Sequence, residues 1–562
     1  MKKIAILFMT VCIMMTVFSA CKKETTLESI AVTTQPNNKK YFVGEDFDPT
    51  GMVVTATYSD KTTKPIAVTE VMLNYDFKTS GTNKIVTIIY EGKTTTVTGI
   101  TVNSNFTGTG TSDKPFEIGT PEQLAKLAEM INMGHANYKD KYYKLTSDID
   151  LSDYGASFNE GKGWIPIGKR EEYSAYGFYG HFDGNNHKVS GLYINDSDLD
   201  YAGLFGRISG EGTVKNLGVD GEITGGNSVG GIAGGSSGSI TNCYATVTVS
   251  GKDMDIGGVV GYVDGNMTNC YAAGAVSGDK YVGGVTGTVS GSVTNCHATG
   301  AVSGDNTVGG VAGWVLWGGS VNNCYSTGAV SGDMIVGGVA GFVTAFDIYN
   351  YGIVTNCYST GAISGNSDVG GVAGWVFSFG RVTNCYSTGA ISGDNAAGGV
   401  VGRLSGSIKN CYATGTVSGI SGVGGMVGAF VQSYDGSGVV VNSGSITDCA
   451  ALNQNIVRNV SSLETDFFHR IIGGANSGIP SNNVAWDGMQ ALGGITFGVG
   501  AHYNLDGADI TAAEAKTAAF WTTTTATWEG WDTTVWDIAN GRLPILRNVG
   551  GNQTDNNPPE HL

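Results

Sequence analysis

The sequence predicts an all-β protein: a parallel β-helix, or solenoid, of ~26-residue repeats preceded by a small β-sandwich. A six-residue block of the type Val-Gly-Gly-Val-Ala-Gly recurs at spacings of 27, 26, 26, 28, 33, 28 and 26 residues. Its copies begin at Val229, Ile256, Val282, Val308, Val336, Val369, Ala397 and Val423. Glycine accounts for 88 of 562 residues, about twice the usual share. A period this short, without helical periodicity, is typical of stacked β-coils rather than propeller blades.

Stacking explains why such a chain repeats. One coil cannot bury its apolar face, whereas coils stacked ~4.8 Å apart pair each strand with the next coil and share one core. We assign residues 201–450 to the repeat β-helix, 104–200 to an N-terminal capping module and 451–547 to a C-terminal capping module. Residues 548–562, in which Asn, Pro and Asp cluster, are predicted to be a disordered tail.

The first residues predict export with a lipid anchor. Two lysines precede an apolar run over residues 4–17, so residues 1–20 are interpreted as a lipoprotein signal peptide. Val17-Phe18-Ser19-Ala20-Cys21 resembles a bacterial lipobox, which implies acylation of Cys21 and a location at the bacterial outer membrane or cell surface. Residues 21–26 form a tether. The alternative is a simple secreted protein in which this cysteine is incidental.

Residues 27–103 predict the sandwich. Short alternating strands such as Lys84–Tyr90 and Thr94–Val102 are separated by turn signals such as Glu91-Gly92-Lys93. The segments Tyr41-Phe42-Val43-Gly44-Glu45 and Gly51 to Tyr58 resemble a bacterial immunoglobulin-like domain of surface proteins. That resemblance implies a stalk without a site of its own.

The repeats also resemble a known family. Tyr201-Ala202-Gly203-Leu204-Phe205-Gly206 and the later hexads resemble the GLUG motif, found in bacterial surface proteins and in some immunoglobulin A peptidases. The helical run Pro121–Asn132 and the segment Gly180–His187 resemble the N-terminal module of that family. The resemblance implies a parallel β-helix in secreted or surface-bound bacterial proteins, often regarded as adhesins. It implies no catalytic site in the repeats.

Charge and composition limit the functions that fit. A net charge of −17 and a pI of about 4.8 argue against nucleic acid and against an anionic membrane surface as partners, leaving the lipid anchor as the only membrane contact. Residues 229–428 contain nine Asp, no Glu and five Lys or Arg, a poor supply for acid–base chemistry. We therefore predict a protein that is not an enzyme. A polysaccharide lyase or glycoside hydrolase is the alternative, with His181, Asp183 and His187 as the reacting groups.

Repeat register converts single residues into columns. Five aspartates stand three residues before a hexad: Asp253, Asp279, Asp305, Asp333 and Asp394. The turn propensity of Ser-Gly-Asp explains them, and calcium binding is the alternative. No other cofactor is expected.

Cysteine and asparagine also recur in register. Eight cysteines are expected to be buried free thiols, because stacked side chains point the same way whereas a disulfide needs converging Cβ vectors. They are Cys243, Cys270, Cys296, Cys324, Cys357, Cys385, Cys411 and Cys449. The asparagines before the first seven cysteines are expected to hydrogen-bond from coil to coil through their amides.

The residue that follows each hexad is often aromatic. Alternation along the strand points this residue outward, and the longer insertions bring further rings to the same side. Exposed aromatic patches commonly mark binding surfaces, and planar rings stack well on sugars. The candidate ligand-binding residues are Tyr262, Trp314, Trp317, Phe342, Tyr349, Tyr351 and Trp375. The alternative is that loops fold over these rings and form a small satellite core.

These observations predict a cell-surface lipoprotein that acts as an adhesin or glycan-binding protein through an exposed aromatic face. Its partner would be a surface glycan, or a host or bacterial surface protein. The β-helix enzyme described above is one alternative, and a passive structural spacer is another.

Overall fold

The computed structural model describes residues 25–43, 45–103, 106–168, 177–345, 349–434, 440–442, 444–459, 467–475, 480–554 and 557–562. The predicted signal peptide and the predicted acylation site Cys21 lie outside these residues. The chain divides into two compact units, residues 1–107 and 108–562.

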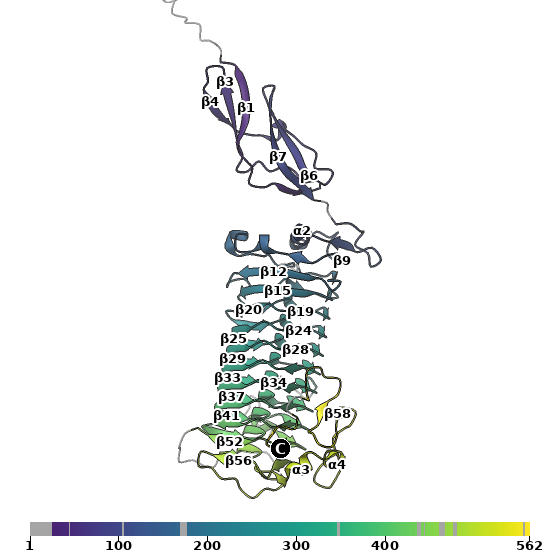
Figure 1. Ribbon diagram of the computed structural model, residues 1–562, viewed down its shortest axis with the longest axis vertical. Helices are drawn as coiled ribbons and strands as arrows, with labels where there is room; N and C mark the ends of the chain where they lie inside the picture. Colours follow the sequence, from purple (N-terminus) through teal and green to yellow (C-terminus); the bar gives the residue numbers. More distant parts are fainter. Residues whose placement is uncertain are drawn as a thin grey trace, which may run out of the picture. The chain divides into compact units, whose positions relative to one another are not determined.

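The first unit is a small β-sandwich (Figure 1). One sheet contains β1 (Leu27–Thr34), β3 (Val53–Tyr58) and β4 (Thr63–Ile66), all antiparallel. The other contains β2 (Lys40–Phe42), β5 (Leu73–Asn74), β6 (Gly81–Tyr90) and β7 (Lys93–Asn103). Alternation places Val86 and Ile88 of β6 in the core, while Ile85 and Ile89 face solvent. The predicted sandwich is confirmed.

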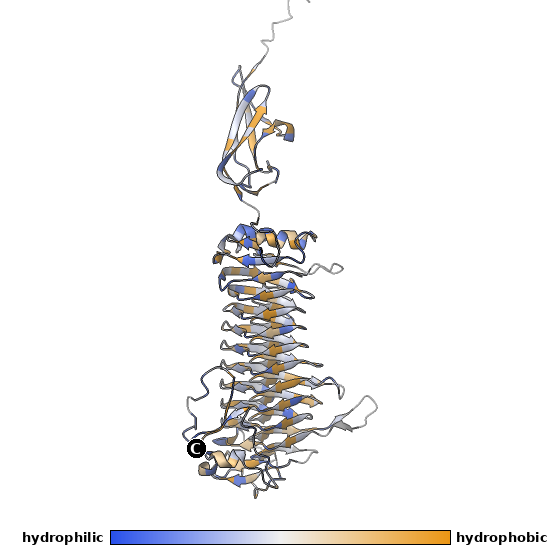
Figure 2. Ribbon diagram, turned by 90° about the vertical axis from the view of Figure 1, so that its right-hand side faces the viewer, coloured by the Kyte–Doolittle hydropathy of each residue, from blue (hydrophilic) through white to orange (hydrophobic). Residues whose placement is uncertain are grey.

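The second unit is a parallel β-solenoid, as predicted, whose strands stack coil upon coil in Figure 1. Within one coil the chain passes through three faces, for example β27 (Ser292–Thr294) on face 1, β28 (His297–Ala298) and β29 (Val302–Gly309) on face 2, and β30 (Ala312–Val315) on face 3. Buried aliphatic side chains, mostly valines, recur from coil to coil, and apolar segments stack along the solenoid in Figure 2. Each face therefore repeats the same side chains from one coil to the next.

Each face is one sheet. Face 1 has twelve strands among the described residues: β8 (Phe116–Ile118), β9 (Tyr142–Leu145), β11 (His181–Asp183), β14 (Thr213–Lys215), β18 (Ser239–Thr241), β23 (Asn266–Thr268), β27, β31 (Ser320–Asn322), β35 (Ile353–Thr355), β39 (Arg381–Thr383), β43 (Ser407–Lys409) and β50 (Ser445–Thr447). Face 3 has ten there: β13 (Phe205–Ile208), β17 (Ala233–Ser236), β22 (Val260–Val263), β26 (Thr286–Val289), β30, β34 (Ala340–Ala345), β38 (Ala373–Ser378), β42 (Val401–Leu404), β47 (Val427–Phe430) and β54 (Ile472–Ala475).

Face 2 is the broadest sheet, because most coils cross it with one short and one long strand. Its described strands are β10 (Ile149–Asp150), β12 (Lys188–Asn195), β15 (Gly218–Gly225), β16 (Val229–Gly230), β19 (Tyr244–Ala245), β20 (Thr248–Gly251), β21 (Met254–Gly257), β24 (Tyr271–Ala272), β25 (Val276–Gly283), β28, β29, β32 (Tyr325–Ser326), β33 (Val330–Gly337), β36 (Tyr358–Ser359), β37 (Ile363–Gly370), β40 (Tyr386–Ser387), β41 (Ile391–Gly398), β44 (Tyr412–Ala413), β45 (Val417–Gly419), β46 (Ser421–Gly424), β51 (Ala450–Ala451), β52 (Asn455–Arg458), β53 (Phe468–His469), β55 (Val484–Trp486), β56 (Gln490–Leu492) and β57 (Ala508–Ile510).

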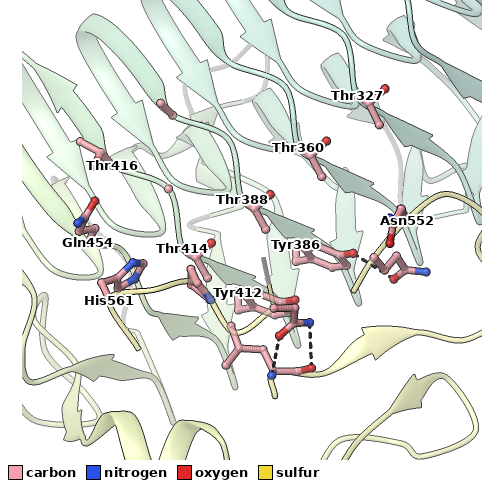
Figure 3. Close-up of a pocket in the computed structure, with 16 residues that line it drawn as sticks. Thr327, Thr360, Tyr386, Thr388, Tyr412, Thr414, Thr416, Gln454, Asn552 and His561 are labelled. Carbon is pink, nitrogen blue, oxygen red and sulfur yellow. Dashed lines mark hydrogen bonds between the residues drawn. The ribbon is translucent and has the colours of Figure 1, made fainter. Parts of the chain in front are cut away.

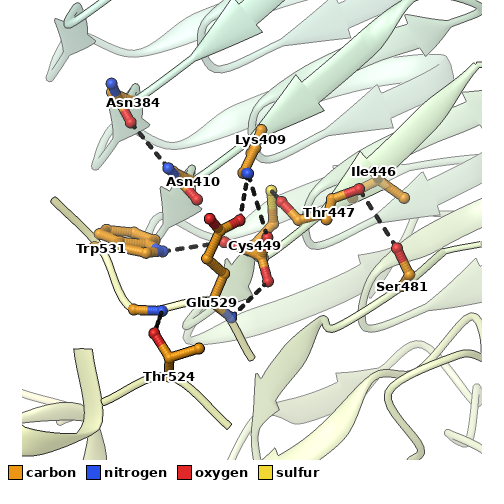
Figure 4. A network of polar contacts seen from close by, with 12 residues as sticks. Asn384, Lys409, Asn410, Ile446, Thr447, Cys449, Ser481, Thr524, Glu529 and Trp531 are labelled. Atoms are coloured by element: carbon orange, nitrogen blue, oxygen red, sulfur yellow. Dashed lines mark hydrogen bonds and ion pairs between the residues drawn. The ribbon is translucent and has the colours of Figure 1, made fainter. Parts of the chain in front are cut away.

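An asparagine occupies the corner between faces 1 and 2 in successive coils. Asn242, Asn269, Asn295, Asn323, Asn356, Asn384 and Asn410 all have φ between 53° and 55°, a left-handed conformation that asparagine tolerates better than most residues. The side-chain amides also bond along the stack: Asn295 Nδ2 donates to Asn269 Oδ1 at 3.1 Å. The same bond joins Asn410 to Asn384 at 3.2 Å (Figure 4). The predicted coil-to-coil amide bonds are confirmed except at Asn323, since Asn356 Nδ2 donates to Asn322 Oδ1 instead, at 3.1 Å.

The cysteine column lies just inside this corner. All eight cysteines of the repeats are buried free thiols, as expected. Cys296 Sγ donates to Thr294 O at 3.2 Å, and Cys296 N donates to Cys324 Sγ at 3.3 Å. Burial raises the pKa of the Cys324 and Cys357 thiols, so these groups stay protonated and act as small core side chains.

The top of the solenoid is closed by α2 (Pro121–Asn132), as the helical run predicts. Thr120 caps this helix by accepting a hydrogen bond from Gln123 N, and Pro121 occupies the first turn. Leu124, Leu127 and Ile131 of this helix are buried. An apolar helix face therefore covers the exposed end of the core.

The other end is closed differently. After β57 the chain forms α3 (Ala512–Ala515), α4 (Ala518–Thr522) and the strand pair β58 (Trp536–Asp537) and β59 (Ile545–Leu546). These elements pack sideways against tyrosines of face 2 through Trp521, Trp528, Trp531 and Trp536.

A polar network ties this module to the coils (Figure 4). Lys409 pairs with Glu529, whose backbone N–H donates to Asp448 Oδ1 at 3.0 Å. Trp531 Nε1 donates to Asp448 O at 3.2 Å. The sideways packing is therefore fixed by both apolar and polar contacts.

The prediction of a disordered tail over residues 548–562 is wrong for the part of it that the structure describes. Val549 and Leu562 are buried. Gly550 O accepts a hydrogen bond from the Tyr358 hydroxyl at 2.8 Å, and Gln553 Oε1 accepts one from Tyr386 at 3.0 Å. Polar composition suggested disorder, but the polar groups are satisfied by hydroxyls of distant coils.

Candidate ligand-binding face

The predicted aromatic row exists as a column on face 3. Strand pairing places Tyr262 beside Thr288, Thr288 beside Trp314, Trp314 beside Phe342 and Phe342 beside Trp375. Because the coils stack in register, residues far apart in sequence become neighbours one strand spacing apart. We call Tyr262, Trp314, Phe342 and Trp375 the face 3 column.

The rings of Trp314, Phe342 and Trp375 in this column contact one another. The ring centroids of Trp314 and Phe342 are 6.1 Å apart with planes inclined by 19°, and those of Phe342 and Trp375 are 5.2 Å apart at 34°. Phe377 lies edge-on to Trp375 at 5.4 Å. The longer strand β38 supplies this extra ring. The result is a continuous aromatic surface over three coils.

The column is half-buried rather than fully exposed. The indole Nε1 atoms of Trp314 and Trp375 are buried and have no hydrogen-bond partner in the described part of the chain. Two candidates outside the strands are open instead: Trp317 is 57% exposed and Tyr349 is 83% exposed. Face 3 thus carries a half-buried aromatic column, and the two exposed rings lie in the connections that follow its strands β30 and β34.

The remaining candidates are held by local partners. The Tyr262 hydroxyl lies 2.9 Å from Ser290 Oγ. The Arg381 guanidinium lies over the Tyr351 ring, 3.6 Å from its centroid. Both rings are therefore oriented within the fold.

A charge pair between the buried Asp368 and the half-buried Arg403 ends the column. Arg403 continues the register after Trp375 and lies 5.3 Å from that ring. Arg403 Nε donates to Asp368 Oδ1 at 2.8 Å. Burial raises the pKa of Asp368, and the guanidinium opposes that shift. This pair anchors the lower edge of the aromatic surface.

The five aspartates predicted as a column, Asp253, Asp279, Asp305, Asp333 and Asp394, are exposed on face 2. Asp305 and Asp333 line a shallow depression of about 410 Å³ with serines and glycines of the neighbouring coils. Among the described residues no group of three or more His, Cys, Asp or Glu is arranged to hold a metal ion. Calcium binding stays a prediction.

The residues of the enzymatic alternative each have local partners on the capping coils. His181 Nδ1 lies 3.1 Å from Thr213 Oγ1, and His187 Nδ1 lies 3.0 Å from Asp148 Oδ1. Burial raises the pKa of Asp183, but hydrogen bonds from Asn185 and Asn216 and the nearby Lys215 outweigh it and lower the pKa overall. A carboxyl group with a lowered pKa is a poor general acid near neutral pH.

Sequence reasoning missed a second aromatic column, on face 2. The residue after each of the first seven repeat cysteines is tyrosine or histidine, and these rings stack with centroids 4.6 to 5.1 Å apart. This tyrosine column consists of Tyr244, Tyr271, His297, Tyr325, Tyr358, Tyr386 and Tyr412. The recurring Cys-Tyr pair is the signal that could have revealed it.

Within the described residues, no helix has the length and apolar character needed to cross a membrane.

Family comparisons agree with the architecture. The model of the bacterial Ig-like domain (group 3) matches residues 34–102, and the model of the GLUG motif matches residues 225–250, 253–277, 365–392 and 393–418. The sandwich is therefore a bacterial Ig-like domain. The solenoid contains four segments that match the GLUG motif.

Two curated relatives match parts of the chain. Halomucin of Haloquadratum walsbyi is 36% identical over 157 residues, which are 28% of this chain and 2% of halomucin. A Gly-rich membrane protein of Evansella cellulosilytica is 36% identical over 115 residues, 20% of this chain and 12% of that protein. This chain thus matches only a small part of either relative.

Two solved structures align with much of this chain, at low TM-scores. A protein described as an immunoglobulin A1 protease of Bacteroides ovatus aligns at 17% identity and a TM-score of 0.25, covering 78% of this chain and 94% of that one. A second IgA1 protease aligns at 14% identity and a TM-score of 0.26, covering 87% of this chain and 30% of that one. Similarities this low support no inference about activity.

Proposed function

We propose that this protein is a bacterial cell-surface adhesin that recognises a glycan through face 3. The observation that carries the proposal is the aromatic floor of Trp314, Phe342 and Trp375 flanked by the exposed rings of Trp317 and Tyr349. A rigid ring offers a large apolar contact to a sugar face and loses little side-chain entropy on binding. A surface protein or host protein is the other partner class.

The half-buried floor and the open rings would have different tasks. Trp314 and Trp375 are fixed by their neighbours, so they give the surface its shape. Trp317 and Tyr349 present accessible ring surface, so they would make the direct contacts. Loss of an exposed ring should therefore reduce binding without unfolding the chain.

A surface location is part of the proposal. It rests on the lipobox-like sequence ending at Cys21, on the GLUG and Ig-like units, and on one relative being named a membrane protein. Replacing Cys21 by Ala in the full chain should move the protein from the membrane fraction to the soluble fraction. Unchanged membrane association and absence of an acylated N-terminal peptide by mass spectrometry would contradict the anchor.

Binding is tested with the purified chain on a broad glycan array. The double variant Trp317→Ala/Tyr349→Ala should lose most of the signal, because both exposed rings are removed. Tyr503→Ala is the matched control, since Tyr503 is also an exposed ring and belongs to the C-terminal coils. A parallel array with a calcium chelator tests the aspartate column.

The outcomes separate the interpretations. A signal lost in the double variant and kept in the control supports glycan recognition by face 3. A signal that needs calcium and survives the double variant moves the site to the aspartates. Silence on every glycan contradicts glycan recognition and leaves protein binding or a spacer role.

A further inference from the structure

A second cavity lies between face 2 and the part of the chain that follows β57 (Figure 3). We call this part, residues 511–554 and 557–562, the C-terminal segment. Its volume is about 620 Å³, within the range of small-molecule sites. One wall is formed by coils of the solenoid and the other by residues of the C-terminal segment, including Leu543, Asn557 and His561. Neither the aromatic face nor the aspartate column contributes to it.

A row of threonines runs along the solenoid wall. Thr327, Thr360, Thr388 and Thr414 each follow the short face 2 strand of their coil, so they recur one coil apart (Figure 3). Thr360 N bonds to Ser326 O and Thr388 N bonds to Ser359 O, which fixes that register. At about 4.8 Å per coil, the row places a hydroxyl at every step along the cleft.

These hydroxyls are not used by the fold. Within the described residues none of the four threonine hydroxyls has a hydrogen-bond partner, nor has the side-chain amide of Gln454 at the end of the row. By contrast, Gln553 on the opposite wall bonds to Leu546, Val549 and Tyr386. One wall is therefore internally satisfied, while the other presents unpaired polar groups to the cleft.

The cleft is polar and carries no strong charge. No Asp, Glu, Lys or Arg is among its described lining residues, and His561 Nε2 is already engaged with Leu452 O at 2.9 Å. A charged ligand would find no counter-ion there. The faces of Tyr386 and Tyr412 are stacked on each other at 4.8 Å, so ring stacking on a ligand is blocked and hydrogen bonding must dominate.

We infer that this cleft binds a neutral, linear oligosaccharide lying along the solenoid axis. Sugar hydroxyls, like threonine hydroxyls, both donate and accept hydrogen bonds. A chain of sugar units offers them at regular intervals, as the threonine row does. The inference extends the proposed glycan recognition to a second site whose contacts are separate from face 3.

The experiment uses the purified chain and calorimetric titration with maltohexaose, cellohexaose and mannohexaose, together with hexagalacturonate as a charged comparison. Thr360→Val/Thr388→Val replaces two cleft hydroxyls with methyl groups. Thr299→Val is the matched control, because Thr299 occupies the same position one coil above Thr327 and lies outside the cleft. Thermal melting of each variant checks the fold.

We expect at least one neutral hexasaccharide to bind, and the double variant to weaken that binding about tenfold or more, since two hydrogen bonds are lost. Thr299→Val and Trp317→Ala/Tyr349→Ala should leave this affinity unchanged. Preference for hexagalacturonate, no binding of any neutral hexasaccharide at millimolar concentration, or equal affinity in Thr360→Val/Thr388→Val would overturn the inference. Loss of binding only in Trp317→Ala/Tyr349→Ala would overturn it while supporting face 3.

Discussion

The solenoid carries two aromatic columns, and the same stacking rule gives them different environments. The tyrosine column on face 2 is regular, and its lower rings, Tyr358, Tyr386 and Tyr412, are buried under the C-terminal segment. The face 3 column is irregular and half-buried, with exposed rings beside it. In a repeat protein an aromatic position therefore becomes core or surface according to whether a distant segment covers it.

The same contrast exists inside the tyrosine column. Its lower hydroxyls donate to Gly550 O, Gln553 Oε1 and Pro544 O. The hydroxyls of Tyr244, Tyr271 and Tyr325 have no such partner among the described residues. Identical repeat residues thus differ only in the cover that lies over them.

The largest expected effect is on stability. Tyr412→Ala should lower the free energy of unfolding by about 4 kcal/mol, because it opens a cavity beside Trp531 and Trp536 and leaves Pro544 O unpaired. Tyr244→Ala, at the uncovered end, should cost about 1 kcal/mol. Urea unfolding followed by tryptophan fluorescence measures both. Equal losses of stability in the two variants would show that burial under the C-terminal segment does not distinguish Tyr412 from Tyr244.

Next comes the charge pair below the face 3 column. Arg403→Ala should cost about 3 kcal/mol, because it leaves the buried Asp368 carboxylate without its partner. Adding Asp368→Ala should restore part of that stability, which a double-mutant cycle by urea unfolding can measure. Additive losses in the cycle would contradict the pairing.

A smaller effect depends on pH. Burial raises the pKa of Tyr358, Tyr386 and Tyr412, so the folded state holds these protons more tightly than the unfolded state does. The stabilisation that these protonated tyrosines give to the folded state is fully present below about pH 10. At higher pH the free energy of unfolding falls, by up to ~1.4 kcal/mol per pH unit for each tyrosine. Tyr386→Phe should make the decline in thermal stability between pH 10 and 12 less steep. An unchanged slope would contradict this assignment.

The smallest expected effect is at the exposed edge of face 3. Trp317→Ala should change stability by less than about 0.5 kcal/mol, because more than half of this side chain is already in solvent. Thermal melting checks this, and the glycan array reports any loss of binding separately. A strong destabilisation would show that the ring belongs to a satellite core.

Register explains what the sequence could predict. The hexads, the asparagines and the cysteines repeat at the coil length, so their columns and their burial follow from periodicity alone. The face 3 column was also predictable, because each member holds the same place after its hexad. Its partial burial was not, since Phe377 contacts Trp375 from a position outside the repeat register.

Contacts without periodicity were missed. The tyrosine column is covered by residues more than 130 positions downstream, and their polar composition suggested a tail without structure. The threonine cleft exists only because that segment folds back over the coils. From the sequence alone, a threonine in a repeat is interpreted as an ordinary turn residue, because the segment that faces it across the cleft is not known.

The backbone hydrogen bonds between coils run along the solenoid axis, which has a mechanical consequence. A pulling force along that axis would load these bonds one coil at a time, so an uncovered stretch should unravel stepwise. Around Tyr358, Tyr386 and Tyr412, however, the C-terminal segment bridges three successive coils. It acts there as a clasp that makes several coils yield together, so the lower part of the solenoid should resist tension better than the upper part.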